Sequence, residues 1–313
     1  MNARIVFAGT PDFAAVHLNS LLEAGIRPVA VYTQPDRPSG RGHKLTPSPV
    51  KVLAQQQDIP VFTPLNFKDE QDILTFESLH ADLAIVVAYG IIIPQRIIEA
   101  PVHGCINVHG SLLPKYRGAA PIQRALFNGD EKTGVTIMRI VKELDAGAML
   151  KMAELPIEKS DTSGTLFEKL SQLGAKTLLS CLDDVLHDRI AEVPQDPALV
   201  TYAAKLDKSE APLNFAKSAD CLDLQVRALN PWPVATAELQ GIKYKIFAAE
   251  PIDDGDHEDY GTIGSIDKKG FIVKCAHGSL RIVRLQAPGK GQVNAADLAR
   301  SLPQTFYTGN KFD

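Results

Sequence analysis

Leu83-Ala84-Ile85-Val86-Val87 is a continuous apolar run, and Cys105-Ile106-Asn107-Val108-His109 follows it further along the chain. An apolar run of this length is typical of a parallel strand that is buried on both faces of a sheet. Further strands are expected over residues 4–8, 28–33 and 134–140. Helices are expected over residues 12–24, 48–57 and 121–128. This alternation predicts an α/β fold with an open, mostly parallel Rossmann-like sheet that helices cover.

The pattern changes in the second half of the chain. Capping residues at 160–162 open a long amphipathic helix, and the segment that follows, 192–208, lacks periodicity and contains two prolines. Alternating strands without intervening helices are then expected over residues 235–246, 271–274 and 279–285. Such strands predict a small β-barrel domain of the oligonucleotide-binding (OB-like) type. The predicted organisation is a Rossmann-like catalytic domain over residues 1–189, a linker over 190–208 and a C-terminal domain over 209–313.

Composition excludes several classes of protein. The chain has 313 residues and a formal net charge of -4, so a strongly basic nucleic-acid binder is not indicated and phosphate contacts would need a local patch. Its four cysteines are far apart, which argues against a zinc site or a disulfide framework. The sequence shows neither a signal-peptide pattern nor an apolar run long enough to span a membrane. We therefore expect a cytoplasmic protein.

Candidate catalytic residues lie where two of the expected strands end. Asn107 and His109 are two positions apart on one strand, so their side chains point to the same side of the sheet. An amide donor beside an imidazole suits a carbonyl that becomes an oxyanion, and Asp145, after the next strand, would complete an acid–base set. Each element also has a plain structural interpretation, because Asn-x-His could be a hydrogen-bonded pair and Asp-Ala-Gly is an ordinary turn.

The segment after His109 favours a ligand site. Gly110 permits close backbone approach, and the backbone groups around Ser111 and Leu113 have no expected strand partner, so they must bind a ligand or be capped. A flat heteroaromatic ligand would satisfy them, and Tyr89-Gly90 at another strand end could add backbone contacts. Only one glycine, Gly9, follows the first strand, so a dinucleotide cofactor is not expected.

The segment from Arg37 to Lys44 is the local basic patch. Residues 37–57 contain four Lys or Arg side chains and no acid, and the glycines and prolines among them predict an irregular loop. One interpretation is a solvated surface loop. The other is a clamp on phosphates or base edges, which arginine and lysine suit.

Beyond these patterns, the chain resembles the methionyl-tRNA formyltransferases along essentially its whole length. The resemblance rests on seven motifs: Phe7–Phe13, Gln34–Pro38, Gly40–Gly42, Asn107–Pro114, Arg117–Gln123, Leu144-Asp145 and Asn230–Pro233. The Asn-His-Asp set is shared with other 10-formyltetrahydrofolate enzymes, including glycinamide ribonucleotide formyltransferase. It therefore indicates formyl transfer without fixing the acceptor, for which the Gly-Arg-Gly loop and the second domain point to tRNA.

The resemblance implies transfer of a formyl group from 10-formyltetrahydrofolate to the α-amino group of methionyl initiator tRNA, in translation initiation. It assigns catalysis to Asn107, His109 and Asp145, with Asp145 holding His109. It implies folate contacts at Tyr89, Gly90, Ser111, Leu112, Leu113 and Pro114. It implies tRNA contacts at Arg37, Arg41, His43 and Lys44. It also implies that the C-terminal domain follows the backbone of the tRNA.

The resemblance requires no metal or redox cofactor and no obligate protein partner. Two alternatives stay open. One is another 10-formyltetrahydrofolate-dependent formyltransferase or hydrolase, which would use a small acceptor or water. The other is a non-catalytic RNA-binding protein built on an enzyme fold, against which the complete set of Asn107, His109 and Asp145 argues.

Overall fold

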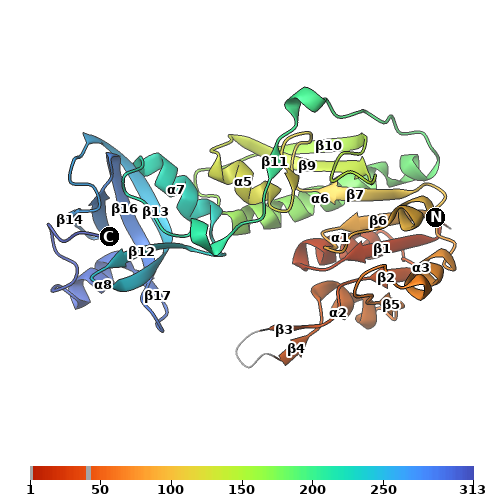
Figure 1. Cartoon of the computed structure of the whole chain (residues 1–313), viewed down its shortest axis with the longest axis horizontal. Helices are drawn as coiled ribbons and strands as arrows, with labels where there is room; N and C mark the ends of the chain where they lie inside the picture. Colours follow the sequence, from red (N-terminus) through yellow and green to blue (C-terminus); the bar gives the residue numbers. More distant parts are fainter. Residues whose placement is uncertain (1–2, 40–43) are drawn as a thin grey trace. The chain divides into compact units, whose positions relative to one another are not determined.

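The structure is a computed structural model that describes residues 3–39 and 44–313 (Figure 1). The chain forms two compact units. The first comprises Met1–Pro121, Lys132–Pro156 and Phe167–Ala203. The second comprises Ile122–Glu131, Ile157–Leu166 and Ala204–Asp313. Two short pieces that precede residue 167 therefore group with the C-terminal part of the chain.

A seven-stranded sheet with the order β10-β9-β7-β6-β1-β2-β5 forms the centre of the first unit. Its strands are β1 (Ile5–Gly9), β2 (Ala30–Tyr32), β5 (Val61–Phe62), β6 (Leu83–Val87), β7 (Cys105–His109), β9 (Lys132–Arg139) and β10 (Met149–Pro156). The five strands from β7 to β5 are parallel, whereas β9 runs antiparallel to β7 and β10 antiparallel to β9. The predicted Rossmann-like α/β class, with a sheet that is mostly parallel, is confirmed.

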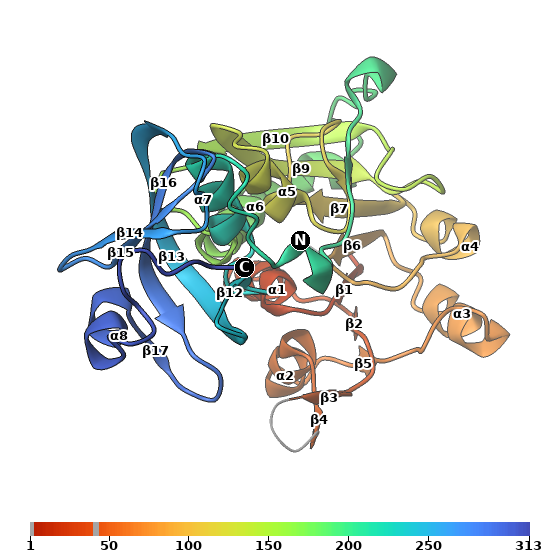
Figure 2. The same ribbon diagram turned by 60° about the vertical axis from the view of Figure 1, so that its left-hand side comes forward.

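Helices bury both faces of this sheet (Figure 2). The helices of the unit are α1 (Asp12–Glu23), α2 (Pro49–Gln56), α3 (Glu70–Glu77), α4 (Gln95–Glu99) and most of α6 (Ser163–Leu186). Along β1, Ile5 and Phe7 pack with residues of α1, α2 and α6, while Val6 and Ala8 pack with residues of α3 and α4. This alternation makes β1 apolar throughout, because each of its faces lies in a separate core.

The sequence predicted the buried strands better than the edge elements. The strands expected at 83–87 and 105–109 coincide with β6 and β7, and the helix expected at 121–128 is α5 (Pro121–Phe127). The strand expected at 28–33 is only three residues long. β10 was not predicted, because it is an edge strand in which exposed charged residues interrupt the apolar ones.

The prediction of an irregular loop in this segment is wrong for residues 37–39 and 44–46, which form strands. β3 (Arg37–Ser39) and β4 (Lys44–Thr46) form an isolated antiparallel ribbon in which Arg37 pairs with Thr46. Pro38 is tolerated there because both strands of such a ribbon are edge strands. Arg41 and His43 lie outside the described residues.

An antiparallel sheet forms the core of the second unit. A C-terminal domain of consecutive β-strands was predicted here from the alternating sequence pattern. The order of the sheet is β12-β13-β16-β15-β14, and β17 pairs with β16. The strands are β12 (Ala235–Leu239), β13 (Ile242–Asp256), β14 (Ile263–Ile266), β15 (Phe271–Lys274), β16 (His277–Gln286) and β17 (Gln292–Asn294). Two helices that were not predicted, α7 (Ala219–Ala228) and α8 (Ala295–Ser301), pack against it. No helix in the described part of the chain is both long and apolar enough to cross a membrane.

Candidate active site

His109 ends β7, and its side chain is almost fully buried, with 6% exposed. Its Nε2 lies 2.8 Å from the carbonyl oxygen of Tyr116. A carbonyl can only accept a hydrogen bond, so this contact places a proton on Nε2. Nδ1 faces Asp145 instead, with Oδ2 of that residue at 3.8 Å. Nδ1 is therefore the ring nitrogen that can take up and release a proton in the site.

Asp145 lies in the loop between β9 and β10 and adopts a left-handed backbone conformation, with φ of 49°. Its Oδ2 accepts a hydrogen bond of 2.8 Å from the backbone N–H of Gly118. The expectation that Asp145 holds His109 stays a prediction, because 3.8 Å is within ion-pair distance but exceeds hydrogen-bond distance. The carbonyl of Tyr116 holds the imidazole, and the carboxylate faces the ring across a gap.

Asn107 lies two positions before His109 on β7, so the two side chains share one face of the sheet. Its backbone pairs with Val86 of β6 and with Met138 of β9, and its side chain is half-buried. The Asn107 amide makes no hydrogen bond to another residue in the described ranges, so its N–H donors can face a ligand. The structure thus brings Asn107, His109 and Asp145 to the end of the sheet where β7 terminates.

The backbone after His109 is capped internally. Ser111 is fully buried and donates its hydroxyl to the carbonyl of Lys115, at 2.7 Å. Thr136 of β9 donates its hydroxyl to the carbonyl of Ser111 and accepts from the N–H of Leu113. Of the two alternatives for these groups, capping is therefore the one observed. Leu112 and Pro114 are only half-buried, so they remain the candidates in this segment for contact with a ligand.

Tyr89 links three strand ends. Its carbonyl accepts hydrogen bonds from the Thr10 hydroxyl at 2.8 Å and from the Gln34 amide at 2.9 Å. Its phenol lies in the core near Phe67, and burial raises the pKa of that hydroxyl. Tyr89 could therefore reach a ligand only through its backbone N–H. Gly90 follows with φ of 75°, and a Cβ there would lie 2.2 Å from Nε2 of Gln34, so a side chain at this position would strain the backbone and displace the Gln34 amide.

A cavity of about 520 Å³ opens beside Gly90. It is lined by residues that follow β2, β5 and β6: Gln34, Pro35, Asp36, Arg37, Leu65, Asn66, Phe67, Lys68, Gly90, Ile91, Ile92 and Pro94. Asp36 forms an ion pair with Lys51 at 2.7 Å. Among the described residues of the lining, Arg37 and Lys68 are the cations. Arg37 and Gly90 were predicted as site residues from the sequence. The cavity itself was not predicted, because its walls come from three segments that are distant in the sequence.

The antiparallel ribbon of β3 and β4, called the basic ribbon below, carries two of the residues that were predicted to contact tRNA. Arg37 and Lys44 are exposed on β3 and β4, while Arg41 and His43 lie between them, outside the described residues. Within residues 3–39 and 44–313, no three His, Cys, Asp or Glu side chains gather in a way that could hold a metal ion.

Comparison with known proteins gives the family. The sequence model of the formyl transferase family matches residues 3–182, which is more than half of the chain. The chain belongs to the formyl transferase family. A second model, for the C-terminal domain of formyl transferases, matches residues 205–303.

Solved structures share the fold of this formyltransferase at low sequence identity. WlaRD, a sugar 3N-formyl transferase solved with dTDP and 5-N-formyl-THF, is 18% identical, with a TM-score of 0.67 over 93% of this chain and 100% of its own. The N-formyltransferase of Helicobacter canadensis, in complex with folinic acid and dTDP-3-aminofucose, is 18% identical, with a TM-score of 0.66 over 90% of this chain and 99% of its own.

HypX from Aquifex aeolicus in complex with tetrahydrofolic acid is a larger protein with the same fold. It is 15% identical, with a TM-score of 0.63 over 97% of this chain and 47% of its own. The formyltransferase therefore spans about half the length of HypX.

Proposed function

We propose that this formyltransferase transfers the formyl group of 10-formyltetrahydrofolate to the α-amino group of methionyl initiator tRNA. The observation that carries the transfer chemistry is the convergence of Asn107 and His109, on one strand end, with Asp145 from the next loop. The folate donor is supported by the solved relatives with tetrahydrofolic acid, 5-N-formyl-THF or folinic acid.

The three side chains suit each step of the transfer. The amine attacks the formyl carbon, and a tetrahedral intermediate forms with negative charge on the formyl oxygen. The Asn107 amide donates a hydrogen bond to that oxygen. The pair of Asp145 and His109 receives the proton that the amine loses, and His109 returns a proton through Nδ1 to N10 of the folate. The bond from carbon to N10 then breaks, and tetrahydrofolate leaves with no net change in protons.

The cavity beside Gly90 has the chemistry of a folate tail. Its lining is largely apolar, with Leu65, Phe67 and Ile92 available to contact an aromatic ring. Lys68 supplies positive charge for the glutamate carboxylates of the donor. We place the p-aminobenzoylglutamate part of the donor there. The backbone of Tyr89 and Gly90, together with Leu112 and Pro114, would then contact the part nearer the formyl group.

The tRNA acceptor is supported by the motifs of the whole chain and by the basic ribbon. Arg37 and Lys44 are exposed cations that can contact the phosphates of a polyanion. Arg41 and His43 lie between them in the sequence. A sugar-nucleotide acceptor is the second candidate. It is favoured by the fold match to WlaRD and to the Helicobacter canadensis enzyme, which covers nearly all of each relative.

One experiment, in which each acceptor is supplied separately, distinguishes these candidates. The full-length protein and 10-formyltetrahydrofolate are incubated with charged initiator tRNA, charged elongator methionine tRNA or a dTDP-linked amino sugar. We expect rapid formylation of the initiator tRNA, slow formylation of the elongator tRNA and none of the sugar. Formylation of the sugar alone would replace the proposed acceptor while keeping the donor, and no transfer to any acceptor would contradict formyl transfer.

A further inference from the structure

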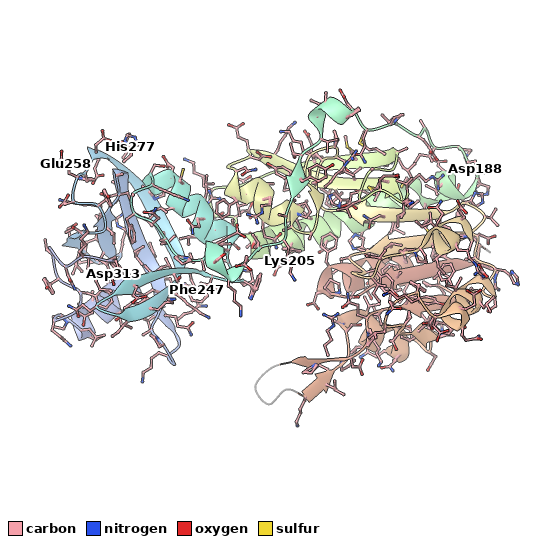
Figure 3. All side chains as sticks on the ribbon, viewed as in Figure 1. Asp188, Lys205, Phe247, Glu258, His277 and Asp313 are labelled. Carbon is pink, nitrogen blue, oxygen red and sulfur yellow. The ribbon has the colours of Figure 1, made fainter. Side chains whose placement is uncertain are left out.

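The segment that follows α6 holds one side chain that is half-buried among exposed neighbours. The segment from α6 to β11 (Tyr202–Ala203) lies between Asp188 and Lys205, which Figure 3 labels. Every residue from 191 to 199 is exposed except Gln195, which is half-buried. Val193 forms a β-bridge with Met149 at the start of β10, so this part of the expected linker lies along the sheet of the first unit. Gln195 thus turns toward the loop that carries Asp145.

The Gln195 side chain joins two loops. Its Nε2 donates hydrogen bonds of 2.8 Å to the carbonyls of both Asp145 and Gly147. Its Oε1 accepts a hydrogen bond of 2.9 Å from Nε of Arg117. The orientation of this amide is fixed by its partners, because carbonyls only accept hydrogen bonds and a guanidinium only donates them. Both N–H donors of the amide are therefore used on the Asp145 loop.

The two loops that Gln195 joins carry the two groups that face the His109 ring, the Tyr116 carbonyl and the Asp145 carboxylate. The loop containing Arg117 supplies the Tyr116 carbonyl to His109 and the Gly118 N–H to Asp145. Tyr116 and Asp145 both have positive φ, 65° and 49°, although neither is glycine. Strained backbone of this kind persists only where the surrounding contacts over-determine it. The catalytic geometry therefore depends on what holds these loops.

Further contacts of the same segment hold the first of these loops. Thr201 accepts a hydrogen bond from the Tyr116 N–H with its hydroxyl, at 2.9 Å, and one from the Arg117 N–H with its carbonyl, at 2.8 Å. β11 also pairs with β8 (Arg117–Gly118). The Asp145 loop ends at the bridge of Met149 and Val193, in which each backbone N–H donates to the carbonyl of the other residue, at 2.8 and 2.9 Å. Gly147 of this loop packs so closely that a Cβ would lie 1.9 Å from the carbonyl oxygen of Arg139. Within the loop itself, the Gln195 amide connects Asp145 and Gly147 to the segment.

We propose that Gln195 is a positioning residue, whose amide holds the Asp145 carboxylate at the distance from His109 that formyl transfer requires. This inference rests on the formyl transfer proposed above. Gln195 acts through Asp145 and does not touch the substrate. Its removal should lower turnover, because a displacement of about 1 Å in a catalytic group costs up to about a hundredfold.

The test compares Gln195→Ala and Gln195→Glu with Leu199→Ala, a matched change at an exposed position of the same segment. We expect both Gln195 variants to lose about ten- to a hundredfold in kcat with little change in the KM for the folate. Glutamate can still accept from Arg117, but it cannot donate to the carbonyls of Asp145 and Gly147, so it should not rescue. The pH profile of kcat should also shift, because the spacing between Asp145 and His109 changes. Leu199→Ala should match the wild type.

A double variant separates positioning from a general structural role. Asp145→Asn is combined with Gln195→Ala, and kcat is measured beside each single variant. If Gln195 acts through Asp145, its loss should add almost nothing to Asp145→Asn. Multiplied losses would overturn the proposal, and so would wild-type turnover in Gln195→Ala. If Gln195→Ala does not fold, Gln195→Met, which keeps the side-chain length, takes its place, and failure of both to fold would make the residue structural and overturn its assignment. An inactive wild type would instead contradict formyl transfer itself.

Discussion

Nδ1 of His109 lies 3.8 Å from Oδ2 of Asp145, so the carboxylate faces the imidazole without a direct hydrogen bond. The opposite ring nitrogen is already committed to the carbonyl of Tyr116. A proton that Nδ1 takes up would therefore lie beside the carboxylate of Asp145. This arrangement allows the pair to store one proton between its removal from the amine and its delivery to the folate.

Asn107→Ala should lower kcat by about a hundred- to a thousandfold, because it removes the donor to the oxyanion. Folding and folate affinity should change little, since Asn107 is half-buried and its amide bonds no other described residue. Turnover and donor affinity are measured beside Asn19→Ala, a change at an exposed asparagine on α1. Near-normal turnover in Asn107→Ala would remove the oxyanion role.

His109 and Asp145 should behave as one unit. Each of His109→Ala and Asp145→Ala should be severely impaired, and the double variant should be little worse than the worse single one, because groups that act together are not additive. Single-turnover rates of the three variants check this. Independent action would show itself as losses that multiply.

Arg41 should serve selection of tRNA and not the chemical step. Arg41→Ala should sharply slow formylation of initiator tRNA without changing folate affinity, and Arg41→Lys should restore only part, because lysine lacks the planar fork of arginine. The initiator-to-elongator rate ratio is compared with that of Arg189→Ala, an exposed arginine paired with Asp183. An unchanged rate and ratio would make the loop a solvated surface feature. The loss in Arg41→Ala should shrink as salt rises if Arg41 contacts phosphate, because the variant has one fewer salt-dependent contact, and stay constant if Arg41 reads bases.

His17 should make the fold sensitive to acid. It is fully buried on α1, its Nε2 has no hydrogen-bond partner among the described residues, and burial lowers its pKa from 6.5 to about 4. Between these values the unfolded chain binds a proton that the folded chain does not. The free energy of unfolding should therefore fall as pH drops from 6.5 to 4, by about 3 kcal/mol from this residue at most.

Urea unfolding at pH 7, 5.5 and 4.5 tests this linkage. His17→Leu should flatten the dependence on pH, whatever it does to stability at pH 7, while His187→Leu, at a position that is half exposed, should leave the dependence unchanged. An equal slope in wild type and His17→Leu would mean that other groups cause the acid sensitivity.

The sequence predicted the parts of the site that depend on strand periodicity. β6 and β7 were found because strands buried on both faces are continuous apolar runs, and the alternation along β7 placed Asn107 and His109 on one face. The partners of His109 and Asp145 were not predicted, because they are backbone groups of Tyr116 and Gly118 that any residue could supply. Gln195 gave no signal, since it lies in an aperiodic segment 50 positions from Asp145.

The most direct test of the function uses 10-formyltetrahydrofolate labelled in the formyl group, with wild type and Asn107→Ala side by side. After reaction with charged initiator and elongator methionine tRNA, the amino acid is released and its label is counted. The wild type should place label on methionine from initiator tRNA and little on methionine from the elongator, and Asn107→Ala should place about a hundredfold less in the same time. Equal labelling of both tRNAs, or none of either, would contradict methionyl initiator tRNA as the acceptor.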